Sequence, residues 1–170
     1  MSTDWGEVYR STFADLVRYL DRKVWDADRA SDLAQEAFTR ALSGDQRNAP
    51  DNPRAWLFSV AANLARDEAR AAVRRRRHLT LLKFESDVAA PDPLANIERA
   101  SRERAARSAL EQLSERDREV LLLWDAGLSY TEIAQQTDLA VGAIGTTLAR
   151  ARQRLVAAHA ELEANHAARG

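Results

Sequence analysis

The residue types that usually carry catalysis are sparse in this 170-residue chain. It contains no cysteine, which excludes disulfides, a thiolate nucleophile and a cysteine-based zinc site. The three histidines, His78, His159 and His166, lie far apart, with no metal-ligand spacing and no Ser/His/Asp or glycine-rich phosphate pattern beside them. The sequence therefore predicts a protein that is not an enzyme and that uses no metal or cofactor. The remaining candidate chemistry is binding through arginine.

Arginine is concentrated in the stretch 52–77, NPRAWLFSVAANLARDEARAAVRRRR. Asn52 is a suitable N-cap and Pro53 suits the first helical position, so the stretch predicts one helix about 36 Å long. Its first half is apolar at helical spacing, which anchors it in a core. Its second half carries the cations Arg66, Arg70, Arg74, Arg75, Arg76 and Arg77. Guanidinium groups suit phosphates and stack on bases, so this end is a candidate nucleic-acid surface; an ordinary solvated helix face is the alternative.

Aromatic side chains accompany these arginines. Trp56 and Phe58 lie on the same predicted helix, and Phe38 lies upstream. Aromatic rings interleaved with arginine favour single-stranded nucleic acid, whose bases stack on them. The alternative is that Trp56 and Phe38 are simply part of the core.

Residues 114–155 predict a helix-turn-helix unit, in which two short helices precede a longer one. Ser114 with Asp117 and Ser129 with Glu132 have the spacing of capping boxes at the starts of the short helices. Apolar residues with the spacing of a shared core follow: Tyr130, Ile133, Ala134, Leu139, Val141, Ile144 and Leu148. A generic helical hairpin is the alternative.

The start of the long third helix is where such a unit meets the major groove. Residues there are Ala140, Gly142, Ala143, Gly145, Thr146 and Thr147. Only the two threonines offer side-chain hydrogen bonds. Arg150, Arg152 and Arg154 follow and are better placed for phosphates than for bases.

Further helices are predicted at 5–25, 28–43 and 94–113, and no stretch alternates with the period of a strand. We therefore expect an all-α chain of two small helical domains, at 1–79 and 94–170. The segment 80–93, which includes SDVAAPDP, has the proline and acidic composition of a flexible linker.

The net charge of −1 argues against a generally basic nucleic-acid binder, but the charge is segregated. Residues 66–77 carry six basic and two acidic side chains, whereas residues 85–98 carry four acids and no base. Local patches, rather than net charge, attract a phosphate backbone. No apolar run is long enough for a membrane span or a signal peptide, so we expect a soluble, cytoplasmic protein.

Together these patterns resemble the extracytoplasmic-function (ECF) sigma factors, the smallest class of bacterial transcription-initiation sigma subunits. Three blocks carry the resemblance, which extends from about residue 9 to 155. They are DADRASDLAQEAFTRAL at 26–42, NPRAWLFSVAANLARDEAR at 52–70 and LSERDREVLLLWDAGLSYTEIAQQTDLAVGAIGTTLARARQRL at 113–155.

The resemblance implies that residues 1–79 are sigma region 2, a three-helix unit. Asp32, Gln35 and Glu36 would then dock on the clamp helices of the largest polymerase subunit. The loop 44–51 and the start of the long helix would open the minus-ten element and capture an extruded base. The implied DNA-binding residues of this region are Asp45, Arg47, Asn48, Trp56, Arg66, Arg70, Arg74, Arg75, Arg76 and Arg77.

The same resemblance implies that residues 94–170 are sigma region 4, which reads the minus-thirty-five element and touches the polymerase flap. Its implied DNA-binding residues are Tyr130, Thr131, Ala143, Thr146, Thr147, Arg150 and Arg152. The partners implied are core RNA polymerase, promoter DNA as duplex and melted strand, and an anti-sigma factor, without membrane insertion.

The family usually starts this recognition helix with a serine cap, followed by a lysine and an arginine. Ala140, Gly145 and Thr147 stand at those positions here. A missing cap and a mid-helix glycine each cost about 1 kcal/mol, so we expect weak minus-thirty-five binding.

Two other functions fit parts of the sequence. A free-standing helix-turn-helix regulator would explain residues 114–155 but not the arginine-rich first domain. A helical interaction protein with weakened DNA binding would suit the poor recognition helix.

Overall fold

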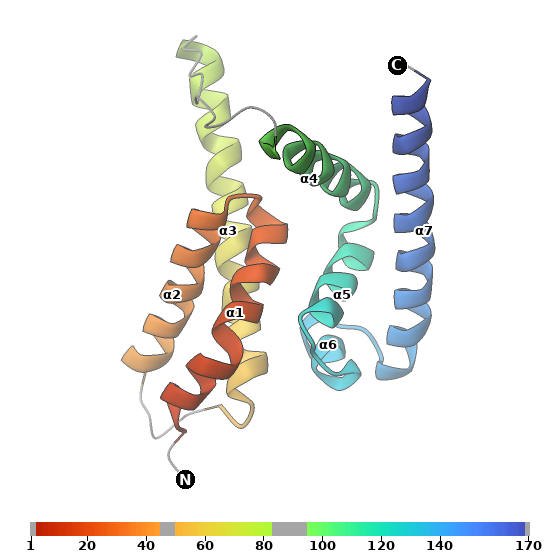
Figure 1. Cartoon of the computed structure of the whole chain (residues 1–170). Helices are drawn as coiled ribbons and strands as arrows, with labels where there is room; N and C mark the ends of the chain where they lie inside the picture. The colour runs from red at the N-terminus through yellow and green to blue at the C-terminus, as the bar shows by residue number, and fades with distance from the viewer. Residues whose placement is uncertain (1–2, 45–49, 83–94, 169–170) are drawn as a thin grey trace. The chain divides into compact units, whose positions relative to one another are not determined.

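A computed structural model describes residues 3–44, 50–82 and 95–168, and helices are the regular elements throughout these ranges (Figure 1). In chain order they are α1 (Trp5–Val24), α2 (Ala27–Ser43), α3 (Pro53–Leu82), α4 (Ala95–Glu111), α5 (Glu115–Asp125), α6 (Tyr130–Thr137) and α7 (Val141–Ala167). The all-α class is confirmed. The predicted linker lies outside the described residues from 83 to 93, and α3 continues to Leu82 rather than ending at the predicted residue 77.

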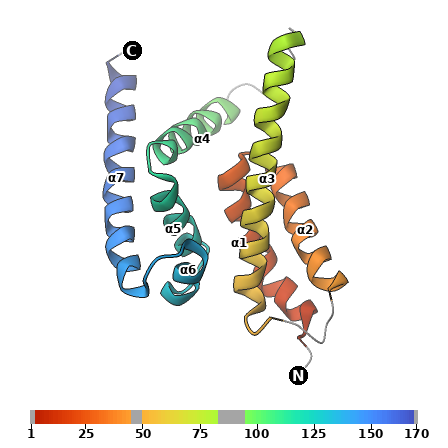
Figure 2. The ribbon, with the colours of Figure 1, turned by 180° about the vertical axis from the view of Figure 1, so that it is seen from behind.

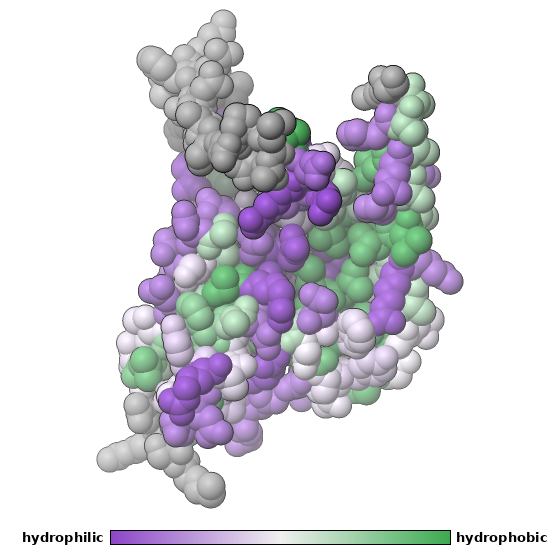
Figure 3. Space-filling model, viewed as in Figure 1, coloured by the Kyte–Doolittle hydropathy of each residue, from purple (hydrophilic) through white to green (hydrophobic). Residues whose placement is uncertain are grey.

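The helices form two compact units, α1–α3 and α4–α7, which both views of the ribbon display (Figure 2). Each unit has a core of its own. The expected domain limits at 79 and 94 remain a prediction. Figure 3 shows green apolar patches among purple hydrophilic side chains on the visible face. Within the described ranges, no helix combines the length and apolar character that crossing a bilayer requires.

In the first unit, α1 and α2 pack on the first half of α3. The N–H of Arg29 donates to the Asp26 carboxylate at 3.0 Å, and that of Ala55 donates to the Asn52 side chain at 3.0 Å. These two caps start α2 and α3 by satisfying N–H groups that the helices leave unpaired. The most deeply buried side chains of this unit include Leu16, Leu20, Leu33, Leu57 and Phe58.

Helix α3 changes character along its length, as the sequence predicted. Its buried residues lie between Ala55 and Ala65, and from Arg66 to Arg77 every arginine is exposed. Burying one large apolar side chain contributes about 1.5–3 kcal/mol, so the first half holds the helix in place. Because the helix is continuous, its buried first half also holds the cationic second half in a defined position.

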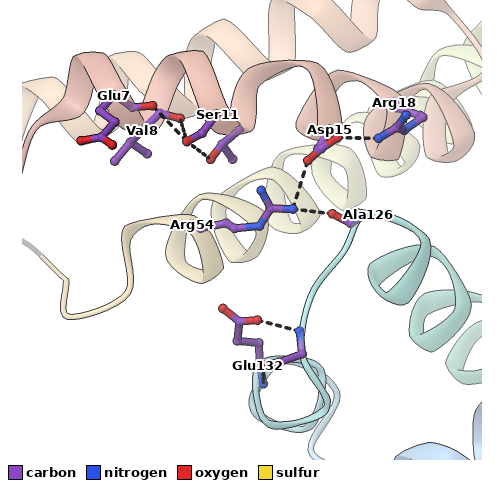
Figure 4. Close-up of polar contacts among 10 residues, drawn as sticks. Glu7, Val8, Ser11, Asp15, Arg18, Arg54, Ala126 and Glu132 are labelled. Carbon is purple, nitrogen blue, oxygen red and sulfur yellow. Dashed lines mark hydrogen bonds and ion pairs between the residues drawn. The ribbon is translucent and has the colours of Figure 1, made fainter.

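In the second unit, α6 and α7 pack around Ile133, Ile144 and Leu148, each at most 2% exposed. Ser129 and Glu132 form the predicted capping box at the start of α6, and Figure 4 shows Glu132 pointing back to that end. Asp138 follows α6 in a left-handed conformation, at φ 56°. Ala140 precedes α7 without a side-chain cap, as expected from its type. The short turn between α6 and α7 completes the helix-turn-helix order.

Candidate nucleic-acid interface

Helix α2 presents the three residues predicted to dock on polymerase. Asp32 and Gln35 are exposed and Glu36 is half-buried, while the opposite face of α2 packs into the core. The Glu36 carboxylate accepts from Arg40 at 2.6 Å. The helix therefore offers its acids on the solvent side, where a basic partner could reach them.

Phe38 belongs to the core and not to a base-stacking surface. It is 5% exposed, and its ring packs edge-on against Tyr9, with centroids 5.0 Å apart. Tyr9 also stacks on Phe13 at 4.6 Å. Trp56 is half-buried, and its ring meets Trp5 at 6.4 Å. The core alternative thus holds for Phe38, whereas Trp56 keeps part of its ring surface accessible.

The arginines in the second half of α3 differ in their hydrogen-bond and ion-pair partners. Arg66 donates to Asn63 at 2.9 Å, and Arg70 lies 3.9 Å from Asp67. Arg74, Arg75, Arg76 and Arg77 are all exposed in consecutive positions. Consecutive residues point around the helix at about 100° intervals, so these cations surround this part of α3 rather than lining one stripe.

Glu68 is one of two anions within this cationic segment, and it is the one that pairs with a residue of α2. Arg29 of α2 donates to it at 2.8 Å, and Arg75 lies 3.3 Å from its other oxygen. The hydrogen bond from Arg29 is the main cause that holds the pKa of Glu68 below its ordinary value, with Arg75 acting in the same direction. Glu68 therefore stays ionised, binds α2 to α3 and partly neutralises Arg75.

A second carboxylate shared by two arginines lies in α1. Asp15 accepts from Arg54 of α3 at 3.1 Å and also pairs with Arg18, as Figure 4 shows. The guanidinium of Arg54 also lies over the Phe58 ring, 5.5 Å from its centroid. These contacts hold the start of α3 against α1.

At the start of α7 the two threonines differ. Thr146 is exposed, but Thr147 is 5% exposed and packs inside the second unit. Thr147 is therefore not available to DNA, because its position faces the same side as the buried Ile144 and Leu148. Tyr130 and Thr131 are exposed at the start of α6, and the Tyr130 ring lies beside Gly145. Ala143 is half-buried.

The arginines of α7 all contact helix α5. Arg150 and Arg154 both bind the carboxylate of Asp117, each at 2.7 Å, and Arg152 lies over the Trp124 ring at 4.0 Å. Only one of the two hydrogen bonds of the capping box predicted for Ser114 and Asp117 forms. The Asp117 N–H donates to Ser114 at 3.1 Å, but its carboxylate turns to α7 instead of to the helix start. Sequence spacing alone could not reveal partners so far along the chain.

The remaining predicted residues, Asp45, Arg47 and Asn48, lie outside the described residues. Within the described residues, the predicted docking residues lie on one side of α2, the predicted cations lie on the second half of α3, and Tyr130, Thr131 and Thr146 are exposed on the second unit. Among the described residues, no group of His, Asp or Glu has the geometry of a metal site.

Comparison with known proteins accounts for both units. Residues 8–76 match the family described as sigma-70 region 2, and residues 103–155 match sigma-70 region 4. The ECF RNA polymerase sigma factor EcfG of Rhodopseudomonas palustris is 35% identical over 134 residues, which cover 78% of this chain and 72% of that protein. The chain belongs to the ECF sigma factors. As a member of this family it directs transcription initiation.

Other sigma factors are similar over most of their length. The sigma factor YlaC of Bacillus subtilis is 27% identical over 158 residues, or 88% of each chain. Among solved structures, the Bartonella quintana sigma factor RpoE, in complex with the anti-sigma factor NepR, superposes with a TM-score of 0.66 at 24% identity. That match covers 91% of this ECF sigma factor and 96% of RpoE. CnrH, in complex with the cytosolic domain of CnrY, gives a TM-score of 0.60, also at 24% identity, with 90% and 85% coverage. These structures share the fold.

Proposed function

We propose that this ECF sigma factor binds core RNA polymerase through the solvent side of α2. Asp32, Gln35 and Glu36 would provide the contact, because they share the exposed side of a helix whose other face is core. Acids on a rigid helix favour a basic partner surface and speed its approach. The protein would act in the cytoplasm, as a binding subunit without catalysis of its own.

The first unit would supply most of the DNA affinity. The observation that carries this is the rigid cationic end of α3, where four consecutive exposed arginines follow a buried first half. Such an end suits the phosphates beside a melted minus-ten element, and the accessible part of the Trp56 ring suits an unstacked base. We assign residues 1–79 to this role, 80–93 to a linker and 94–170 to the minus-thirty-five contact.

The second unit would contact duplex DNA mainly through phosphates. Helix α7 begins with small residues and no side-chain cap, and Thr146 is its exposed hydrogen-bonding side chain in the first two turns. Tyr130 and Thr131 stand at the start of α6, where helix-turn-helix units cross the DNA backbone. We therefore expect tolerance of base changes in the minus-thirty-five element.

An anti-sigma factor is the proposed protein regulator. Support comes from two solved structures of the same fold: the sigma factor RpoE is described in complex with the anti-sigma factor NepR, and CnrH in complex with the cytosolic domain of CnrY. Co-purification from cells, followed by addition of the captured protein to a transcription reaction, would test this. Unchanged transcription would contradict the proposal.

The test of the proposed function is run-off transcription with core polymerase on a library of genomic fragments. We expect discrete transcripts that depend on the added chain. The matched variant replaces Asp32 and Glu36 by alanine, which should keep the fold and weaken core binding in a pull-down. The control variant replaces Glu98 and Glu103 of α4, exposed acids outside the proposed surface. Equal core binding by both variants would contradict the assignment of α2.

A further inference from the structure

Asp117 of α5 is an almost fully buried carboxylate, at 1% exposure, in a unit whose other described buried polar side chain is Thr147. Arg150 donates to it through Nη2 at 2.7 Å and through Nε at 3.4 Å, and Arg154 donates through Nη1 at 2.7 Å. A buried charge is costly unless it is paired and hydrogen-bonded. The hydrogen bond from Arg150 holds the pKa of Asp117 below its usual value, against the effect of burial. The carboxylate is therefore ionised at neutral pH.

Both guanidinium groups remain accessible while they hold Asp117. The side chains of Arg150 and Arg154 are 46% and 55% exposed. A guanidinium has five N–H donors, and neither arginine uses more than two of its nitrogens on Asp117. Residues four apart lie on one face of a helix, so the guanidinium groups of Arg150 and Arg154 can both contact the same ligand. With one anion between two cations, the cluster keeps one net positive charge.

We propose that Asp117 is a positioning residue that holds Arg150 and Arg154 as one clamp for a single phosphate of duplex DNA beside α7. The inference rests on the proposed DNA contact of the second unit and deepens it. A free arginine side chain loses rotamer entropy when it is fixed, and Asp117 fixes two of them before DNA arrives. The clamp thereby gives a recognition helix poor in base-reading side chains a defined position on the backbone.

Positioning and simple charge make opposite predictions for Asp117→Asn. Removal of an anion near DNA should, by charge alone, tighten binding and steepen its dependence on salt. Loss of a positioning group should weaken binding and make the dependence shallower, because the two arginines no longer present a preorganised site. The sign of the change therefore separates the two effects.

The experiment measures binding of the full chain to a short fluorescein-labelled duplex of mixed sequence between about 50 and 200 mM salt. We expect Asp117→Asn to lower the slope of log affinity against log salt by about 0.9, which corresponds to one phosphate contact. The matched control is Glu111→Gln in α4, which removes one carboxylate of the same unit that pairs with Arg107 at 2.9 Å. The control should leave the slope unchanged.

If Asp117 has a purely structural role, Asp117→Asn should lower the midpoint of thermal unfolding. The slope of log affinity against log salt would then be unchanged or steeper, when it is measured at a temperature where circular dichroism shows a folded chain. That outcome would overturn the proposal. If Asp117→Asn fails to fold, the same salt dependence is measured for Arg150→Gln, for Arg154→Gln and for the double variant. A shared phosphate predicts that each single change lowers the slope by about 0.9 and that the double change lowers it no further. An additive double effect would overturn the clamp.

The two proposals fail in distinguishable ways. Absence of transcripts with core polymerase, together with the expected loss of slope in Asp117→Asn, would reject the proposed function and retain the clamp. Transcription that depends on the chain, with no change of slope in the Asp117 and arginine variants, would reject the clamp alone.

Discussion

Individual carboxylates fix the positions of several arginine side chains in this chain by pairing with two of them at once. Asp117 shows the limit of reading residues in sequence: its spacing from Ser114 indicated a capping box, but its carboxylate binds arginines 33 and 37 residues later. Thr146 and Thr147 show the same limit, since two adjacent identical residues point about 100° apart and only packing decides which is buried. Local chemistry was predictable at Ser129 and Glu132, whose partners lie within one turn.

At this scale we predict that Asp117 contributes to stability in a pH-dependent way. Its folded-state pKa is lowered, chiefly by the Arg150 hydrogen bond, so its contribution is present above the unfolded pKa of about 3.9 and is lost as pH falls through the folded pKa. At neutral pH, Asp117→Asn should lower the free energy of unfolding by about 3 kcal/mol, at the low end for a broken buried pair because the arginines are half-exposed.

Urea unfolding of the two proteins at neutral pH and near pH 3 would measure this difference. The gap should shrink in acid, because below about pH 3.9 the unfolded chain binds a proton at this aspartate whereas the folded chain, with its lowered pKa, binds it only at lower pH. A gap that stays constant across the range would mean that Asp117 stabilises the fold by packing rather than by charge.

The helices themselves were largely predictable, because their signals are local. Apolar spacing and caps such as Asn52 and Ser129 placed the helix starts within a residue or two. The end of α3 was less predictable, since no glycine or proline stops it and the run of arginines gave no boundary. Which arginines would be paired also escaped prediction, because pairing depends on contacts between α2 and α3 or between α5 and α7.

Helix α7 should be easy to stabilise at its start. Ala140 has the extended backbone of an N-cap but no side-chain bond, and a Cβ added at Gly142 would meet nothing within 4 Å. We expect Ala140→Ser to raise the free energy of unfolding by about 1 kcal/mol and Gly142→Ala to raise it by about 0.5–1 kcal/mol. Thermal and urea unfolding would measure both changes. Ala149→Ser, on an exposed interior position of α7, is the control and should give no gain.

The cationic end of α3 should matter more for promoter opening than the start of α7. Arg74 and Arg77 are exposed, whereas Arg75 is partly neutralised by Glu68. We therefore expect Arg74→Ala with Arg77→Ala to impair open-complex formation by the holoenzyme more than Thr146→Ala does. The measurement is permanganate footprinting on one promoter at fixed salt. Greater damage from the threonine change would mean that α7 reads bases despite its small residues.

The whole molecule consists of two helical units that each bury their own apolar side chains. Leu16, Leu57 and Phe58 lie in the core of the first, and Leu123, Ile133 and Ile144 lie in the core of the second. The sequence indicated this division through the change of composition after residue 79. Charge pairing across helices was not predictable from the sequence: in the described residues Asp15, Glu68 and Asp117 each contact two arginines.

At the scale of the molecule we predict that residues 1–82 and 95–170 each fold when expressed alone. Separate cores make cooperative unfolding of each fragment the expected result. Circular dichroism should show helical spectra and one sigmoidal melt per fragment. A fragment that stays unfolded in buffer would show that its core depends on the other unit, which would move the domain limits.

The carboxylate shared by Arg150 and Arg154 also restricts how this protein can diverge. Loss of Asp117 would leave two cations without their common anion, and loss of one arginine would leave a buried charge half-compensated. Positions 117, 150 and 154 should therefore change together in related lineages, in steps that preserve the balance of charge. The ion pairs on the surface of α4 are exposed, so substitutions at those positions should occur independently of one another.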